Sequence, residues 1–283
     1  MLFRSIHFLD RFTSLRKLGL TFQSKSMKCI SVISRLGNLQ SLRLRSRDPF
    51  GQPSGLELRP LKEHSTLSNL YLLGVIKDDI HLLPQKLEIL TLSLSGLKED
   101  PMSVLGKLPR LNTLRLFAGS YVGSKMTCPA LQHFPVLRVL KLWSLEELKE
   151  CTVEQDAMPQ LVELEIRGCK KLEKTDGLEH LPALKELILT NMTEDFVADV
   201  RRRLGRDKLI SRTLLNSHVS FLLYQYSATA IIPSSTIRLF AICHFFSFLF
   251  WAHFYLKHVK DQARDQNHLI FASILSLDRK SVV

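Results

Sequence analysis

Side chains that could take part in catalysis or hold a metal ion are scattered along this 283-residue sequence rather than grouped in motifs. The ten histidines form no H-E-x-x-H motif, and the five cysteines form no C-x-x-C pair, so neither common zinc arrangement is present. Ser95-Gly96-Leu97-Lys98 spells S-x-x-K, but the S-D-N and K-T-G motifs that accompany it in penicillin-binding enzymes are missing. We therefore expect no enzyme, no cofactor and no metal site. Surface turns are expected for five histidines: His7, His64, His81, His133 and His180.

Leucine, in contrast, recurs at a regular spacing. The spelling L-x-x-L-x-L occurs eight times, once with Ile166 in the last position. From one middle leucine to the next the step is 20 to 28 residues, within the range of roughly 20–29 that is typical of leucine-rich repeats. The middle leucines are Leu18, Leu42, Leu70, Leu90, Leu114, Leu140, Leu164 and Leu187.

The repeated spelling predicts one short strand per repeat. Apolar residues at every second position indicate a strand with one buried face, and a single repeat cannot bury its own leucines. Stacked repeats can, which predicts an α/β solenoid whose strands form a parallel sheet on the concave side. Between the strands, L-x-x-[LF]-P-x-L recurs, as in Leu105–Leu111 and Leu178–Leu184. Proline ends a helix before the strand begins, so short turns and irregular convex segments are expected rather than long helices.

The strand positions that alternate with the leucines face away from the core and form two columns along the sheet. Arginines and aromatic residues recur in these columns, and both types are enriched in binding hot spots. A protein-binding concave face is one reading, and a solvated sheet face whose aromatics pack against their neighbours is the other. We also expect Glu163 and Glu165 to pair with Lys141 or Arg167 across strands. The candidate protein-binding residues are Arg43, Arg45, Tyr71, Arg115, Phe117, Lys141, Trp143, Glu165 and Arg167.

Longer phrases carry a family resemblance over about residues 10–210. Leu70-Tyr71-Leu72-Leu73-Gly74, Phe134–Trp143 and Leu164–Leu172 follow one another in an order that is specific, unlike L-x-x-L-x-L alone. Together they resemble the leucine-rich-repeat region of plant intracellular disease-resistance proteins of the coiled-coil, nucleotide-binding type. Asn191-Met192-Thr193, with Phe196 and Val200, is similar to the closing helix of that family. Because no G-x-x-x-x-G-K-[ST] phosphate loop occurs, ATP binding is not carried over.

The resemblance implies a leucine-rich-repeat horseshoe that recognises proteins in the cytoplasm. The partner would be a pathogen effector, a guarded host protein or a nucleotide-binding switch domain. The five widely spaced cysteines fit a reducing compartment. Although the formal net charge is +12, residues 51–204 carry twenty bases and twenty-one acids, so the excess lies at the two ends. Such a distribution is not the uniform basic field of a nucleic-acid-binding protein, and no nucleic-acid partner is expected.

The sequence after the repeats is of a different kind. We expect a leucine-rich-repeat domain of about eight repeats over residues 1–210 and a C-terminal tail over residues 211–283. Within the tail, residues 239–256 carry no formal charge, and their length is at the lower limit for spanning a bilayer. This segment reads as a transmembrane helix, as an apolar helix packed on the end of the solenoid, or as non-native sequence. The first reading gives the alternative function, a membrane-anchored leucine-rich-repeat receptor-like protein.

Overall fold

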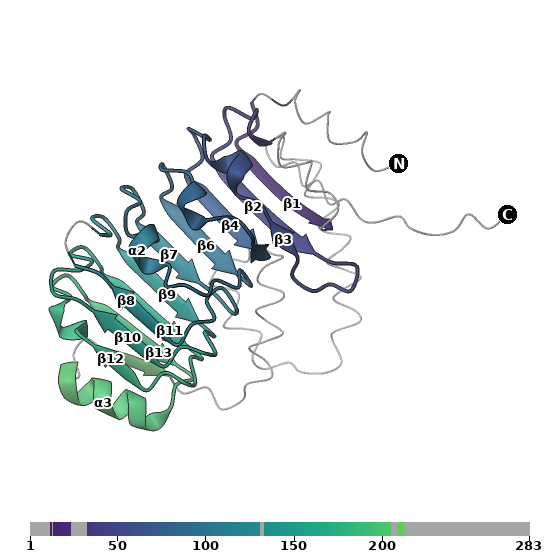
Figure 1. Cartoon of the computed structure of the whole chain (residues 1–283). Coiled ribbons are helices and arrows are strands. Elements are labelled where there is room, and N and C mark those ends of the chain that lie inside the picture. The colour runs from purple at the N-terminus through teal and green to yellow at the C-terminus, as the bar shows by residue number, and fades with distance from the viewer. Residues whose placement is uncertain (1–11, 13, 24–32, 131–132, 205–208, 213–283) are drawn as a thin grey trace, which may run out of the picture. The chain divides into compact units, whose positions relative to one another are not determined.

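Parallel strands stacked side by side dominate the computed structural model, which describes residues 12, 14–23, 33–130, 133–204 and 209–212 (Figure 1). Among these residues the main sheet has nine strands, and all neighbouring pairs in it are parallel. The predicted α/β leucine-rich-repeat solenoid is therefore confirmed. In sheet order the strands are β1 (Lys17–Gln23), β2 (Ser41–Arg47), β4 (Asn69–Leu73), β6 (Ile89–Ser93), β7 (Thr113–Leu116), β9 (Val139–Trp143), β11 (Glu163–Arg167), β13 (Glu186–Thr190) and β14 (Leu209–Arg212).

The leucines form one continuous core along this sheet. The middle leucines lie opposite one another, so Leu114 of β7 is aligned with Leu90 of β6 and with Leu140 of β9. All eight middle leucines have exposed fractions of 4% or less. Burying one leucine side chain stabilises a fold by about 1.5–3 kcal/mol, and here each leucine is buried by the repeats on either side.

The start of each strand is set by the backbone rather than by outward side chains. The N–H groups of Ser68 and Asn69 both donate to the carbonyl of Gln40, each at 2.9 Å. The same arrangement recurs two strands further on, where Asn112 and Thr113 both donate to the carbonyl of Glu88. Because these bonds use main-chain atoms only, the outward side chains can vary without changing the register.

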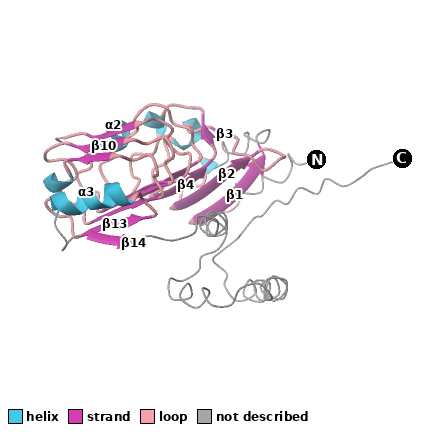
Figure 2. Ribbon diagram, turned by 90° about the horizontal axis from the view of Figure 1, so that it is seen from below, coloured by secondary structure: helices cyan, strands magenta, loops and turns pink. Residues whose placement is uncertain are grey.

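Short helices and a second sheet occupy the return segments, on the opposite side of the core from the main sheet (Figure 2). Short return segments were predicted, but the second sheet was not; it is parallel, with the order β12 (Lys174–Asp176), β10 (Glu150–Val153), β8 (Lys125–Cys128). The remaining short elements are β3 (Gly55–Leu56), β5 (Val75–Ile76), the 3-10 helices η4 (Arg59–Leu61), η5 (Ile80–Leu82) and η6 (Leu178–His180), and the helix α2 (Met102–Leu105).

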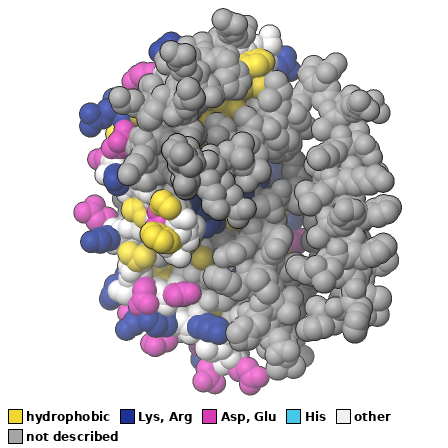
Figure 3. All heavy atoms as spheres, turned by 90° about the vertical axis from the view of Figure 1, so that its right-hand side faces the viewer, with side chains coloured by type: hydrophobic (Ala, Val, Ile, Leu, Met, Phe, Trp, Pro, Cys, Tyr) yellow, Lys and Arg dark blue, Asp and Glu magenta, His cyan; other side chains and the backbone are white. Residues whose placement is uncertain are grey.

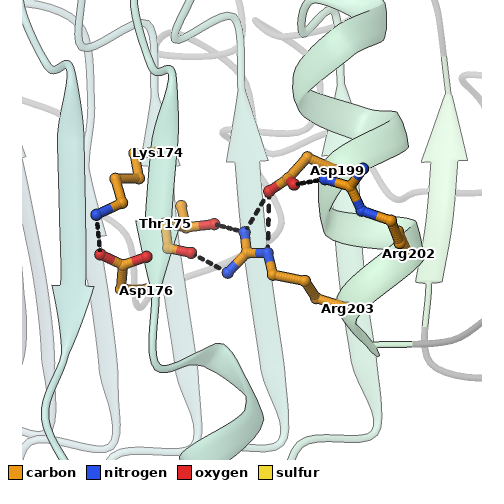
Figure 4. Close-up of polar contacts among 6 residues, drawn as sticks. All are labelled: Lys174, Thr175, Asp176, Asp199, Arg202 and Arg203. Carbon is orange, nitrogen blue, oxygen red and sulfur yellow. Dashed lines mark hydrogen bonds and ion pairs between the residues drawn. The ribbon is translucent and has the colours of Figure 1, made fainter.

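The helix α3 (Glu194–Leu204) corresponds to the closing helix implied by the resemblance, and it buries Phe196 and Val200 against the core. Arg203 near its C-terminal end donates to the main-chain carbonyl and, at 3.2 Å, to the hydroxyl of Thr175 on β12 (Figure 4). Its Nε also donates to Asp199 at 2.9 Å. Arg203 therefore joins α3 to the edge strand of the second sheet.

His64 departs from the sequence-based expectation of a surface turn, because it is only 6% exposed. It lies just after η4, and its N–H donates to the carbonyl of Leu61 at 3.0 Å. This turn holds it beside the fully buried Leu61, and burial lowers the pKa of its imidazole. His81 and His180 are exposed, as expected.

The C-terminal part of the sequence stays a matter of prediction. Residues 213–283, including the apolar segment 239–256, lie outside the described residues. Within the ranges that the structure describes, no helix combines the length and the apolar character needed to cross a bilayer. The strand β14 was not predicted, and it extends the sheet across the expected boundary between residues 210 and 211.

Candidate protein-binding face

The face of the main sheet opposite the leucine core, here called the ladder face, carries the predicted columns in register. Arg43 is aligned with Tyr71, and Arg115 with Lys141 and then Glu165. In the second column Trp143 is aligned with Arg167. Phe117 follows β7 directly, and its N–H donates to the carbonyl of Leu92, which continues the ladder by one residue. All nine candidate residues therefore lie on this face, and eight of them are half-buried while Glu165 is 9% exposed.

The first cluster on the ladder face consists of two arginines around one tyrosine. The guanidinium carbons of Arg43 and Arg45 lie 4.9 and 5.9 Å from the centre of the Tyr71 ring, within range for cation–π attraction. Burial raises the pKa of Tyr71, and the two arginines oppose this shift. Burial lowers the pKa of Arg45. Tyr71 opposes this lowering, and the positive charges of Arg43 and Arg47 add to it.

The second cluster is built on a pair of stacked aromatic rings. The rings of Phe117 and Trp143 are nearly parallel, with centres 4.5 Å apart and planes 12° apart. Arg167 lies 5.1 Å and Lys141 6.0 Å from the centre of the Trp143 ring. A rigid apolar platform flanked by cations is thereby presented on the sheet, which is the combination that binding hot spots favour.

The predicted charge pairing across strands is confirmed for Lys141. Its Nζ lies 2.7 Å from a carboxylate oxygen of Glu163 and 2.9 Å from one of Glu165. Burial lowers the pKa of Lys141, but the hydrogen bonds and charges of the two glutamates outweigh it, so the pKa is raised. For Arg115, burial lowers the pKa and Glu163 opposes the change. Lys141 therefore stays charged at neutral pH, and so does Arg115, because arginine is not deprotonated in proteins.

Among the described residues, no three or more His, Cys, Asp or Glu side chains are placed to hold a metal ion. The described cysteines, Cys128, Cys151 and Cys169, are buried and unpaired by disulfides. What the ladder face offers chemically is flat aromatic area and fixed cations, which suits binding to another macromolecule.

Comparison with known proteins agrees with this geometry. The family model described as leucine-rich repeat region matches residues 4–204. The chain belongs to this family. Disease resistance protein RPP8 of Arabidopsis thaliana is 40% identical over 119 residues, which cover 42% of this chain and 13% of the relative. Disease resistance RPP8-like protein 3 of the same plant is 31% identical over 203 residues, 68% of this chain and 22% of the relative. Disease susceptibility protein LOV1, also from Arabidopsis thaliana, is 32% identical over 194 residues, 67% of this chain and 21% of the relative.

The relatives confirm the predicted resemblance to plant disease-resistance proteins. This leucine-rich repeat region spans between 13% and 22% of the length of the three relatives. The similarity therefore concerns the repeats and not the remaining length of these relatives.

One strongly exposed aromatic residue, in a loop of this leucine-rich repeat region, was missed by the sequence analysis. Phe50, in the loop that follows β2, is 88% exposed. Asp48 shapes this loop, because its Oδ1 accepts from the N–H groups of Phe50 and Gln52, both at 2.8 Å. Gly51 adopts a positive φ of 81°, which glycine tolerates best. The spelling Asp48-Pro49-Phe50-Gly51 was the available turn signal.

Proposed function

We propose that this leucine-rich repeat region is the protein-recognition module of a plant immune sensor. It binds a protein partner through the ladder face and performs no catalysis. The partner is a pathogen effector, a guarded host protein or a nucleotide-binding switch domain. Support comes from relatives that are named as disease resistance proteins and from the residues of the ladder face.

The observation that carries the proposal is the second cluster. Stacking of Phe117 on Trp143 fixes both rings, so a partner can bind them with little further loss of side-chain freedom. Arg115 and Arg167 supply rigid planar cations nearby, which suit carboxylates on another protein. The two rings lie on the face opposite the leucine core, so they are not needed to fill it.

Partner capture by two matched variants tests the proposal. The full chain is expressed in plant cells with a proximity-labelling enzyme attached, and labelled proteins are quantified by mass spectrometry. Arg115→Ala combined with Trp143→Ala removes a cation and half of the stacked pair from the ladder face. Lys107→Ala combined with Arg110→Ala changes two exposed residues next to Leu108 on a return segment.

Labelling of the specific partners should fall at least fivefold in the ladder-face variant and stay within twofold of wild type in the return-segment variant. Circular dichroism and thermal melting of both purified proteins establish that they are folded. Equal labelling by wild type and the ladder-face variant would show that the partner binds elsewhere.

We also propose the cytoplasm as the location, since a reducing compartment keeps thiols unpaired. Cys128 and Cys151 lie on neighbouring strands of the second sheet, and both are free. Their state in protein isolated from plant tissue, measured by differential alkylation, tests this part. Oxidised Cys128 and Cys151 would contradict it.

A further inference from the structure

The ladder face is divided into two halves of different charge. On β1, β2, β4 and β6, the described side chains at outward positions include no acid. Their charged members are Lys17, Arg43, Arg45 and Arg47. We call these four strands of the ladder face the basic half. On other parts of the surface, positively and negatively charged side chains are mixed. Along one margin of the side view in Figure 3, the described Lys and Arg side chains alternate with Asp and Glu.

The other half of the ladder face is electrically balanced. On β7, β9, β11 and β13 the outward side chains include three bases and three acids. Lys141 illustrates the balance, because two carboxylates lie within 3 Å of its Nζ. The balancing groups are Arg115, Lys141 and Arg167 against Glu163, Glu165 and Glu186.

Arg45, in the middle of the basic half, has unused hydrogen-bonding capacity. Its Nε and Nη2 are shielded from solvent and have no hydrogen-bond acceptor among the described residues. A shielded donor without an acceptor is costly to leave unsatisfied, and more so in a charged group. The positive charges of Arg43 and Arg47 on the same strand also disfavour the charge of Arg45. A carboxylate that bound the Arg45 guanidinium after the side chain had turned outward would accept these hydrogen bonds and offset the neighbouring positive charges.

The spacing of the arginines shows what form the ligand takes. Arg43, Arg45 and Arg47 occupy alternate positions of one extended strand, so neighbours are separated by about 6.6 Å. An extended peptide presents its own alternate side chains at the same interval. Carboxylates at alternate positions of such a peptide therefore meet successive guanidinium groups, and a guanidinium can bind a carboxylate through two parallel hydrogen bonds. Arg47 already donates from Nη1 to the main-chain carbonyl of Gly51, so its remaining N–H groups would serve this purpose.

We propose that the basic half binds an extended acidic segment of a partner protein, whose carboxylates at alternate positions pair with Arg43, Arg45 and Arg47. The proposal rests on the proposed function in that the ligand is a protein. A nucleic acid fits less well, because Tyr71 already carries two guanidinium groups at its ring, where a base would stack. The balanced half offers no net positive charge to a long polyphosphate that runs further along the face.

Defined peptides test this proposal without knowledge of the natural partner. The probe is a fluorescein-labelled octapeptide of alternating glutamate and serine, added to the full chain and followed by fluorescence anisotropy at 50 and 300 mM NaCl. Comparison probes are a peptide with the same glutamates in one block, an alternating lysine and serine peptide, and a thymidine octanucleotide. The alternating acidic peptide should bind at least tenfold more tightly than the lysine peptide and at least threefold more tightly than the block peptide, and the higher salt should weaken it.

Two variants with equal changes in net charge locate the site. Arg43→Gln with Arg45→Gln should weaken binding of the alternating acidic peptide at least tenfold. Lys107→Gln with Arg110→Gln, on a return segment, should leave it within twofold of wild type. Thermal melting confirms that both proteins are folded, and Arg43→Lys with Arg45→Lys provides a second variant that keeps the charge but loses the two-bond geometry.

Unchanged peptide binding by Arg43→Gln with Arg45→Gln overturns the proposal, as does tighter binding of the oligonucleotide than of the acidic peptide. Failure of this proposal can be told from failure of the proposed function. Loss of partner labelling in Arg115→Ala with Trp143→Ala, together with no acidic-peptide binding, overturns only the acidic-segment proposal. Peptide binding together with unchanged labelling overturns the role of the second cluster instead.

Discussion

Replacement of Leu140 by alanine tests whether one leucine core holds the repeats together. Leu140 is 1% exposed and is aligned with Leu114 on one side and Leu164 on the other. Hydrogen bonds along β7, β9 and β11 hold these neighbours in place, so the space left by alanine cannot collapse fully. Buried leucine-to-alanine changes cost about 2–5 kcal/mol, and we expect about 3 kcal/mol here. That is a large part of a typical native stability of roughly 5–15 kcal/mol.

Urea unfolding followed by far-ultraviolet circular dichroism measures this cost. With a slope of about 2 kcal/mol per molar urea, the midpoint of Leu140→Ala should fall by about 1.5 M. Arg138→Ala is the matched control, because Arg138 is exposed two residues earlier and its truncation should cost less than about 0.5 kcal/mol. Leu140→Asp, which buries an unpaired charge, should not fold at all. If Leu140→Ala loses less than about 1 kcal/mol, Leu140 is not in the shared core and the reasoning fails.

Three further predictions concern polar and thiol groups. Lys141→Gln should lower the free energy of unfolding by about 1–3 kcal/mol at pH 7, since it leaves two glutamates without their cation. Because the pKa of Lys141 is raised in the folded protein, its stabilising contribution should persist up to pH 10 and disappear as the pH rises through that raised value. A stability difference between wild type and Lys141→Gln that is already gone at pH 9 would contradict this. Burial raises the pKa of Cys169 to about 12, so iodoacetamide at pH 8 should leave this thiol unmodified in the native protein and modify it in urea. Peptide mass spectrometry measures the modification, and rapid labelling of the native protein would disprove the burial of Cys169. Arg203→Ala should lower the free energy of unfolding, measured in urea, by about 1–2 kcal/mol, because it removes the hydrogen bonds to Thr175. Arg201→Ala, at an exposed position, should leave it unchanged. Equal losses in the two variants would refute the role of Arg203.

The main sheet and its ladder face were predictable because their signal repeats eight times. A period of two fixes which side chains share a face, and equal phases across repeats fix the register, so Arg115 beside Lys141 followed directly from counting. The pairing of Lys141 with Glu163 and Glu165 followed as well. Once the columns are assigned, the sequence also contains the charge division of this face, although the sequence analysis did not draw it: the acids lie on β11 and β13, and the described outward residues of the basic half include none.

Strands and turns whose own residues show no clear sequence pattern were not predicted. The strand β8 has alternating burial at Met126 and Cys128, but four residues are too few to tell a strand from a turn. Its stability comes from pairing with β10, which the sequence does not reveal. In β14, Leu209–Arg212 lacks the leucine spelling and is defined by its pairing with β13. His64 was misplaced for a similar reason, since its burial depends on the turn after Leu61.

The shared register has an evolutionary consequence. Tyr71, Thr91 and Arg115 follow one another in one column at successive repeats. Recombination that removed the 24 residues from Leu90 to Thr113 would place Leu114 beside Leu70, so the leucine core would stay unbroken. On the other face, the same event would bring Arg115 next to Tyr71 and change the side chains that the ladder face presents. The loss of one whole repeat would therefore alter the ladder face and leave the alignment of the leucine core intact.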